Sequence, residues 1–326
     1  MKFKKNILLL ITVMILFNVT IILFNLQNCF ALSNDLSVMM NDDTVTNNEV
    51  IDDETIATPA PKVVRDTFSF RYKFKEGDTL IYSVMSKDSI TIDYGEPLYR
   101  IRFEKIMITC DSVKRNGNFC LTQKLISFNA RESHLKEKNI ERKNTEWLNI
   151  PVYIEIDSLG RRIKAYNPDT MNGVVAPGGP FQPYLFMSLD STDEGINKKL
   201  TNESWLVSGT DTLVENGMPI PTLKYSSLFR MIGLVDTLDF TNVLKMTFIV
   251  TGQGLIEVLT NQLKIKTFAK IASGGEIFWD TENWIPQLYI HTMSQKLTIY
   301  YPRGVEKVGT HNLYTTYVLD KLSRRK

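Results

Sequence analysis

Apolar and polar residues alternate with a period of two along several segments of the chain. The clearest examples are residues 80–85, 106–110 and 244–250. This period is typical of half-buried β-strands, because successive side chains of a strand point to opposite faces of the sheet. The part of the chain from residue 66 onward is also rich in Val, Ile, Thr, Tyr and Phe. The sequence therefore predicts a mainly β fold, an antiparallel meander of long hairpins.

Turn residues separate the predicted strands. Asn116-Gly117 lies between two alternating segments and is a strong hairpin signal, since both residues tolerate a positive φ. Residues 158–160, 252–254 and 282–283 are predicted to form the turns of other strand pairs. The charged segment 131–146 has too few apolar residues for a buried helical face, so it is predicted to be a solvated loop or a short surface helix.

The order of these elements is compatible with an internal duplication. A hairpin at 98–128 is followed by strand, Asp turn and strand, and a hairpin at 241–259 is followed by the same plan. Two interpretations stay open: an ordinary meander, or two similar curved half-sheets in a half-barrel or sandwich, formed by residues 66–170 and 190–326.

A segment rich in Pro and Gly, residues 174–189, connects the two parts. It combines chain-breaking residues with four large apolar side chains, Phe181, Tyr184, Leu185 and Phe186. One interpretation is a connection packed against the sheet, and the other is the rim of an apolar cavity. These four residues are the candidate ligand-binding residues.

The N-terminus has the layout of an export signal. Three lysines at positions 2, 4 and 5 precede an apolar run from Ile7 to Phe24, and Cys29-Phe30-Ala31 fits a cleavage site after Ala31. Residues 1–31 are therefore predicted to be a signal peptide. Two alternatives are open: the run is retained as a single-pass anchor, or Cys29 is lipidated, although Asn28 is not the small residue that lipidation favours. All three place the rest of the chain outside the cytoplasm, in the periplasm, secreted or tethered to a membrane.

Residues 32–65 are predicted to form a disordered linker. Positions 33–61 contain seven acidic residues and no Lys or Arg, together with many Asn and Thr. Such a composition cannot bury enough apolar surface to offset the entropy of ordering. The folded part is then a β-rich domain at 66–326.

Charge excludes one class of partner. Removing three lysines with the signal leaves 38 − 3 = 35 basic residues against 36 acidic ones, so the mature chain is almost neutral. No nucleic-acid partner is expected. Contact with a membrane is expected only through the N-terminal segment, if that segment is not cleaved.

Common catalytic and cofactor motifs are missing from the sequence. There is no His-Glu-x-x-His, nucleophile elbow, phosphate loop, dinucleotide fingerprint or Cys-x-x-Cys. No catalytic residue, metal site or cofactor is predicted. His134 is predicted to be exposed in the charged segment, and His291 to lie on a solvated strand face with Gln287 and Tyr289.

Two carboxylates occupy comparable positions, because Asp157 and Asp280 each end a strand before a turn. We expect them to accept turn hydrogen bonds; the alternative is an acid–base pair of a hydrolase. Trp279 and Trp284 flank the second turn and are expected to cap the β core, with stacking on a ligand as the alternative.

Cys110 and Cys120 are candidates for a disulfide in an oxidising compartment. With a two-residue loop at Asn116-Gly117, Cys120 would lie opposite Val113, and Cys110 opposite Gln123. The two thiols would then point to opposite faces, which argues against a bridge. A β-bulge would change this register, so the bridge stays open.

Two short segments carry a resemblance. Lys75-Glu76-Gly77-Asp78 leading into a Tyr-bearing strand, and Ile154 to Gly160, resemble uncharacterised secreted β-rich envelope proteins of Gram-negative bacteria. Those domains are similar in general plan to the curved half-barrels that carry lipids or lipoproteins. The resemblance implies a non-catalytic role in the envelope and assigns no functional residue.

Taken together, these features favour a non-enzymatic extracytoplasmic protein that binds a lipid or another apolar ligand on a curved sheet. A surface module that docks an envelope protein through its sheet edges or its basic end is the first alternative; that end contains Lys321, Arg324, Arg325 and Lys326. A carboxylate-dependent hydrolase is the second.

Overall fold

The computed structural model describes residues 67–69, 71–145, 148–166, 185–189, 198–215, 218–237, 240–260 and 263–324. The chain divides into two compact units between Lys62 and Val63, and all described residues belong to the second. The predicted signal peptide and acidic linker lie outside the described residues. The described part contains no helix with the length and apolar character needed to span a bilayer.

The described residues are mainly β. One 3-10 turn, η1, covers Pro302–Gly304. The strands are β1 (Thr67–Ser69), β2 (Thr79–Ile92), β3 (Leu98–Val113), β4 (Phe119–Ser133), β5 (Ile140–Arg142), β6 (Pro151–Ile156), β7 (Arg162–Tyr166), β8 (Lys198–Leu200), β9 (Ser204–Glu215), β10 (Met218–Val235), β11 (Val243–Thr260), β12 (Leu263–Asp280), β13 (Ile285–Tyr300) and β14 (Glu306–Ser323).

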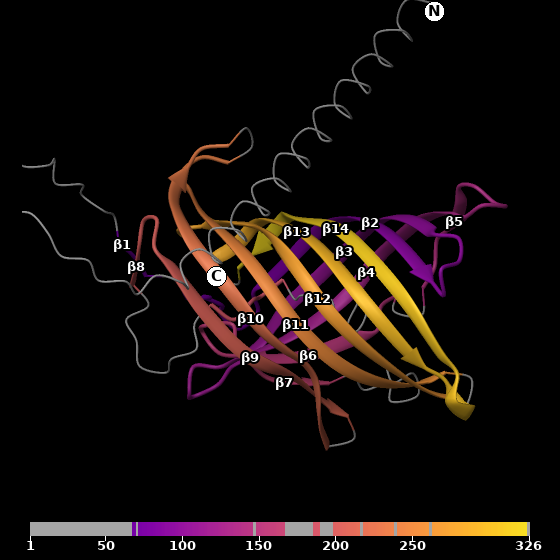
Figure 1. The fold of residues 1–326 in the computed structure, drawn as a ribbon. Helices are drawn as coiled ribbons and strands as arrows, with labels where there is room; N and C mark the ends of the chain where they lie inside the picture. Colours follow the sequence, from indigo (N-terminus) through magenta and orange to yellow (C-terminus); the bar gives the residue numbers. More distant parts are fainter. Residues whose placement is uncertain are drawn as a thin grey trace, which may run out of the picture. The chain divides into compact units, whose positions relative to one another are not determined.

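Twelve strands form one antiparallel sheet, and β1 and β8 form a separate pair. The order in the large sheet is β7-β6-β4-β3-β2-β14-β13-β12-β11-β10-β9, with β5 paired to the outer edge of β4. Figure 1 shows the result of this order, in which the C-terminal strand β14 lies beside the early strand β2. The sheet curves strongly, and Cα atoms of its end strands β7 and β9 come within 8 Å of one another. Those two strands are not hydrogen-bonded neighbours, so the sheet is not closed into a barrel.

The alternation seen in the sequence is confirmed in the strands. In β2 the even-numbered residues from Leu80 to Asp88 are buried, and β3 continues the pattern with Ile106, Ile108 and Cys110. In β11 the even-numbered residues from Leu244 to Val250 are again buried, and Val243 at the start of the strand is buried as well. We call the face that carries these buried side chains the inner face. Both predicted halves contribute strands to this one sheet, and their relatedness stays a prediction.

The inner face carries the apolar core of the domain. The N-terminal residues Tyr72 and Phe74 and the short segment 185–189 pack against it. Tyr72 contacts Trp279 with ring centroids 5.0 Å apart, and Phe186 contacts both Tyr72 and Phe74 at 5.3 and 5.4 Å. Burial of aromatic rings of this size contributes strongly to core stability.

The turn predicted at residues 252–254 is wrong, because these residues lie within β11. Gly252 pairs with Tyr225 of β10, and a Cβ atom at this position would lie 2.9 Å from the Lys224 carbonyl oxygen. The glycine therefore serves close packing between strands rather than a turn. The hairpin predicted at 241–259 is replaced by a longer one, in which β11 pairs with β12 along its whole length.

The register predicted for the Asn116-Gly117 hairpin is also wrong. The turn is longer than two residues, since the Lys114 amide donates to the Asn118 carbonyl, and a register shift follows between Cys110 and Ser112. Cys110 therefore lies opposite Leu121, and Cys120 opposite Ser112. Both cysteines are free thiols, Cys110 buried and Cys120 half-buried.

Segment 131–146 differs from the expected loop or surface helix. β4 extends to Ser133, and Ile140–Arg142 forms β5, which pairs with residues 130–132 of β4. The free edge of β4 provides hydrogen-bond partners for the backbone N–H and C=O groups of Ile140–Arg142. His134 is half-buried in the connection between the two strands, and its Nε2 lies 3.6 Å from the Glu137 carboxylate.

Asp157 and Asp280 hold turns, as expected. One oxygen of Asp157 accepts the amides of Leu159 and Arg161, and one oxygen of Asp280 accepts the amides of Glu282 and Asn283 at 2.8 and 2.9 Å. The flanking Trp279 is fully buried, and Trp284 packs against the same core. The prediction that these tryptophans cap the core is confirmed.

Candidate functional site on the inner face

One row of paired residues crosses the inner face from β9 to β5. Its members change in character from aromatic, through small and polar, to cationic. In order they are Trp205, Phe229, Phe248, Gly275, His291, Thr315, Ser86, Arg102, Ala130 and Arg142. We call this set the inner row. Because paired residues of neighbouring strands are in side-chain contact, the row is a continuous surface.

The aromatic end of the inner row is a series of stacked rings. Trp205 and Phe229 stack with centroids 5.4 Å apart, and Phe229 contacts Phe248 at 6.4 Å. Phe248 stacks in turn on Tyr289, which lies in the adjacent row, at 5.6 Å. A side chain at Gly275 would collide with the Phe248 ring and with the Ile290 carbonyl, so this glycine leaves the space in which the ring lies flat on the sheet.

His291 lies at the centre of the inner row, and the prediction of a solvated position for it is wrong. It is 1% exposed and stacks on Phe248 and Tyr289. Its Nε2 lies 3.2 Å from the Ser273 hydroxyl. Burial lowers the pKa of His291 to about 3, because the charged imidazolium is disfavoured away from water. The imidazole is therefore neutral at neutral pH and continues the aromatic series.

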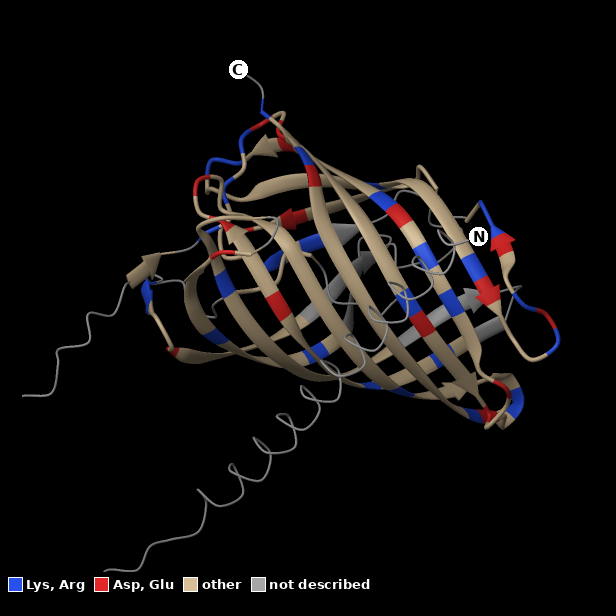
Figure 2. Ribbon diagram, turned by 90° about the horizontal axis from the view of Figure 1, so that it is seen from above, with Lys and Arg blue, Asp and Glu red and all other residues tan. Residues whose placement is uncertain are grey.

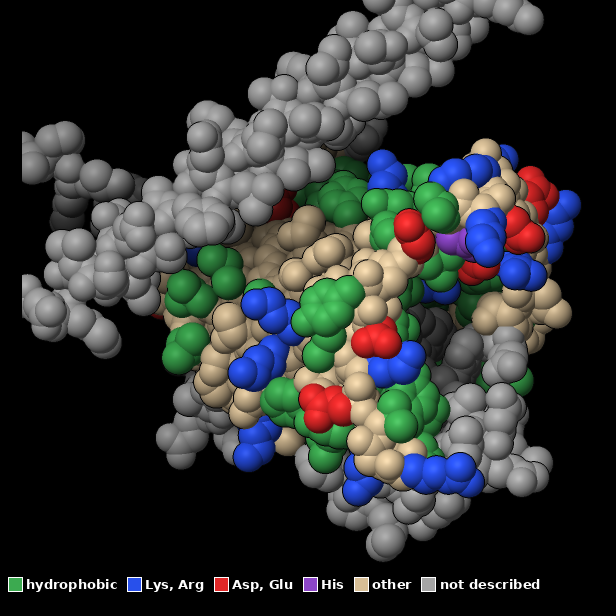
Figure 3. Space-filling model, turned by 45° about the vertical axis from the view of Figure 1, so that its right-hand side comes forward, with side chains coloured by type: hydrophobic (Ala, Val, Ile, Leu, Met, Phe, Trp, Pro, Cys, Tyr) green, Lys and Arg blue, Asp and Glu red, His purple; other side chains and the backbone are tan. Residues whose placement is uncertain are grey.

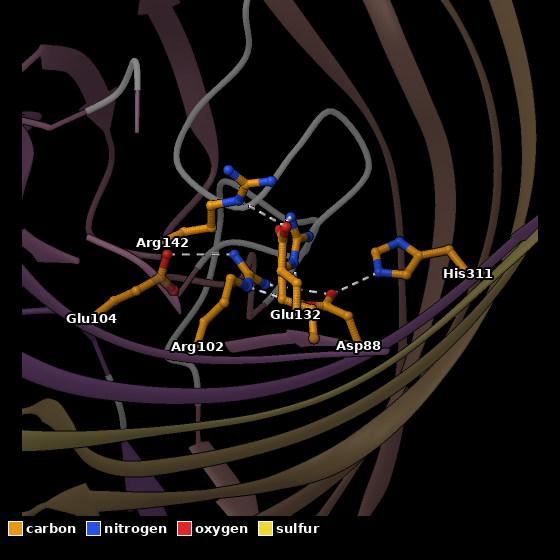
Figure 4. A network of polar contacts seen from close by, with 7 residues as sticks. Asp88, Arg102, Glu104, Glu132, Arg142 and His311 are labelled. Atoms are coloured by element: carbon orange, nitrogen blue, oxygen red, sulfur yellow. Dashed lines mark hydrogen bonds and ion pairs between the residues drawn. The ribbon is translucent and has the colours of Figure 1, made fainter. Parts of the chain in front are cut away.

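The cationic end is a network of charged side chains from β2, β3, β4, β5 and β14. We call it the ionic network: Asp88, Arg100, Arg102, Glu104, Glu132, Arg142 and His311. Figure 4 shows its labelled members on the inner side of the curved ribbon, pointing toward one another. The sheet topology explains how residues so far apart in the chain meet, because β14 and β3 flank β2 on either side.

Asp88 is the centre of the ionic network, with a side chain that is completely buried. It receives hydrogen bonds from Arg102 Nε at 2.9 Å, Arg100 Nε at 3.2 Å and His311 Nε2 at 2.8 Å. A carboxylate only accepts hydrogen bonds, so Nε2 of His311 carries a proton. Burial by itself raises the pKa of Asp88, but His311, Arg102 and Arg100 outweigh it and hold the pKa at about 2.

Glu104 stands on the opposite side of Arg102. The Arg102 guanidinium lies 3.4 Å from its carboxylate. Burial nevertheless raises the pKa of Glu104 above its ordinary value, against the lowering effect of Arg102. The two carboxyls that contact Arg102 thus differ in their tendency to hold a proton.

Three hydrogen bonds hold segment 185–189 and Tyr72 against the apolar part of the inner face. The Tyr72 hydroxyl donates to the Met187 carbonyl at 3.1 Å, and the Trp205 indole N–H donates to the Leu189 carbonyl at 2.7 Å. The Tyr289 hydroxyl contacts the Met187 sulfur at 3.7 Å. These contacts fasten segment 185–189 to both β9 and β13.

The four candidate ligand-binding residues are only partly within the described chain. Leu185 and Phe186 are buried in the apolar core, 6% and 7% exposed, so this part of the segment packs against the sheet. Phe181 and Tyr184 lie outside the described residues. A role of these four residues in ligand binding stays a prediction.

Sequence reasoning missed the ionic network. Asp88 and His311 are 223 positions apart, and no local spacing signals their contact. A usable signal was the break in alternation in β2 and β3, where charged residues replace apolar ones at inward positions. Within the described residues, no group of three or more His, Cys, Asp or Glu side chains is arranged to hold a metal ion.

Comparisons with known proteins identify no family. No family model matches the chain, and no curated protein matches it. Among solved structures, a lipovitellin studied for its lipid–protein interactions is similar over 78% of this chain, with 13% identity and a TM-score of 0.42. The matched part spans about a quarter of that protein, 26% of its length.

A second solved structure is similar over 75% of this chain and over 100% of its own length, with 7% identity and a TM-score of 0.17. It is a loop-deletion mutant of OmpT, an outer membrane protein of Vibrio cholerae. At these scores neither match contributes to the functional argument.

Proposed function

We propose that this chain is a non-enzymatic extracytoplasmic protein of the cell envelope that binds a lipid or another ligand with a large apolar part on the inner face of its sheet. The observation that carries the proposal is the inner row, which joins a stack of aromatic rings to a buried ionic network. A surface that is apolar at one end and charged at the other is complementary to an amphipathic molecule.

Ordinary core packing does not require such a row. Polar groups at inward positions of a sheet cost free energy unless they are hydrogen-bonded, and a fully apolar row is as stable or more stable. Here Ser86 and Thr315 bond to one another at 3.1 Å, and the ionic network occupies three further inward positions of β3. Packing of an apolar core does not explain these polar residues at inward positions, and their presence favours a binding surface.

The extracytoplasmic location is supported by the sequence of residues 1–31. The non-enzymatic assignment is supported by the roles of the two carboxylates that were candidates for a hydrolase. Asp157 and Asp280 each accept two turn amides on one oxygen, and the second oxygen accepts Arg161 Nε or the Asn283 side-chain amide, so both carboxylates are engaged in holding turns.

Ligand extraction tests the proposal. The full chain with a C-terminal tag is purified from an exporting bacterial host, then analysed by native mass spectrometry and solvent extraction. We expect about one bound amphipathic molecule per chain, containing an acyl or comparable apolar group. The control variant Leu228→Gln changes an outward residue of β10 and is expected to keep the ligand. An empty protein that takes up no added lipid would contradict the proposal.

A protein-interaction module is the second candidate function. It is favoured by three apolar side chains paired across the outer face, Leu206, Leu228 and Ile249, which are 62%, 43% and 42% exposed. Figure 3 shows apolar side chains exposed among charged ones on one face of the molecule, and Figure 2 shows Lys, Arg, Asp and Glu interspersed over the sheet. Exposed apolar rows of this kind are common in interfaces.

The basic C-terminal end gives this second candidate less support. Arg324 is turned back onto the domain, where it lies 3.6 Å from the buried carboxylate of Asp78 and contacts the Asn283 carbonyl. Arg324 is therefore engaged in contacts within the domain. Arg325 and Lys326 lie outside the described residues.

A further inference from the structure

We propose that the ionic network recognises an anionic headgroup, a phosphate or carboxylate, through the terminal nitrogens of Arg142 and Arg100. This inference rests on the proposed function, because it assigns the polar end of the same inner face. It names the chemistry of the ligand at that end: an amphipathic molecule with an acidic headgroup.

The arginines are held in place by their Nε atoms. Arg100 Nε and Arg102 Nε both donate to Asp88, and Arg142 Nε donates to Glu132 at 3.1 Å. A guanidinium anchored at Nε still has its end-on edge turned away from the anchor, and this edge presents one N–H of each terminal nitrogen. Those nitrogens form the planar fork that binds phosphate and carboxylate with two parallel hydrogen bonds.

The terminal nitrogens of two of the three arginines are available. Those of Arg102 are engaged by Glu104 and Asp88. Neither terminal nitrogen of Arg142 has a hydrogen-bond acceptor among the described residues, and Arg100 has only the distant Glu132 carboxylate at 4.0 Å. The side chains of Arg100 and Arg142 are 26% and 57% exposed, so a ligand can reach them.

The register places a small residue between two of the cations. Ala130 lies between Arg102 and Arg142 in the inner row. Its side chain is a single methyl group, so the longer arginines on either side are not separated by bulk. The small residue therefore does not cover the Arg142 guanidinium from the Arg102 side, and a guanidinium fork binds a compact anion in preference to a neutral polar group.

The charge of the network agrees with an anionic ligand. Three guanidinium groups face three carboxyls and the imidazole of His311. Asp88 is held as a carboxylate by its partners, whereas burial of Glu104 favours the neutral acid. With Glu104 in its neutral form, the three guanidinium groups exceed the two remaining carboxylates by one positive charge, which an acidic headgroup would balance.

The test uses the full chain and two lipids with identical acyl chains, phosphatidylglycerol and diacylglycerol, together with inorganic phosphate. We expect the wild-type protein to bind phosphatidylglycerol more tightly than diacylglycerol. Arg142→Gln is expected to weaken phosphatidylglycerol binding roughly tenfold or more, the value of a lost charge-assisted hydrogen bond. Its affinity for diacylglycerol should not change.

Arg131→Gln is the matched control. Arg131 is the neighbour of Ala130 on β4, points to the outer face and pairs with Glu141 of β5, so the variant removes the same charge from the same strand pair. It is expected to bind phosphatidylglycerol like the wild type. Folding of both variants is checked by the denaturation midpoint.

The outcomes separate the two proposals. Equal affinity of the wild type for both lipids, or equal binding by Arg142→Gln and Arg131→Gln, overturns the headgroup inference and keeps the apolar-ligand function. Binding of inorganic phosphate with no binding of either lipid supports the anion site and overturns the apolar-ligand function. Binding of none of the three probes overturns both.

Discussion

Replacing Asp88 by asparagine is expected to lower the free energy of unfolding by about 3–5 kcal/mol, the cost of removing one partner from a buried ion pair. The substitution keeps the shape of the side chain and removes its charge. Arg102, which is 5% exposed, then keeps its positive charge without its nearest carboxylate. Chemical denaturation monitored by far-ultraviolet circular dichroism gives the measurement.

The same substitution removes a pH-dependent contribution to stability. The pKa of Asp88 is about 2 in the folded protein, below the unfolded value near 3.9. A lowered folded pKa stabilises the fold above the unfolded pKa, and this contribution is lost as the pH falls from about 4 through 2. The stability difference between wild type and Asp88→Asn should therefore shrink across this range.

Asp93→Asn is the control for this experiment. Asp93 follows the end of β2, is 54% exposed at its side chain and pairs with Lys307 at 3.3 Å. An exposed pair of this kind contributes at most about 1 kcal/mol. Equal and small effects of the two variants would show that the ionic network is solvated and would contradict the buried arrangement.

Replacing Gly160 by alanine is expected to destabilise the protein by roughly 2–5 kcal/mol, from a left-handed backbone and an overpacked contact together. Gly160 has a φ of +79°, and a Cβ atom there would lie 2.2 Å from the Met187 carbonyl oxygen and 2.5 Å from the Tyr72 ring. The added methyl group should push segment 185–189 away from the inner face. Denaturation and near-ultraviolet circular dichroism measure both effects.

Gly117→Ala separates the two causes. Gly117 has a similar φ of +85°, with no atom within 4 Å of an added Cβ. This variant should lose only the backbone contribution, about 1–2 kcal/mol, and keep its near-ultraviolet spectrum. If both variants lose the same stability, the close packing of Met187 and Tyr72 on Gly160 is not a stabilising contact.

The strands could be predicted from the sequence because each is specified locally. The alternation at 80–85 and 244–250 and the Asp turns at 157 and 280 depend on residues a few positions apart. The errors occurred where partners in the fold override local signals. Gly252 was interpreted as a turn because glycine is common there, yet its role is set by the close approach of the Lys224 carbonyl on the neighbouring strand.

The candidate site could not be predicted, because it depends on pairing between distant strands. His291 was assigned to a solvated face since polar residues usually point outward, and only the structure shows that its face is the inner one. The inner row requires nine strand pairings to be known before its members can be ordered. Asp88, Arg102 and His311 are brought together by the pairing of β14 with β2 and of β2 with β3.

Site-specific photocrosslinking tests the central claim, that the ligand lies on the inner face. A p-benzoylphenylalanine is placed at Tyr225 or at Leu228 of β10, in the protein loaded with its ligand. Tyr225 lies over Gly209 and Gly252 on the inner side, and Leu228 is exposed on the outer side. We predict a ligand adduct at position 225 and none at 228; an adduct at 228 alone would contradict the claim and assign binding to the outer apolar row.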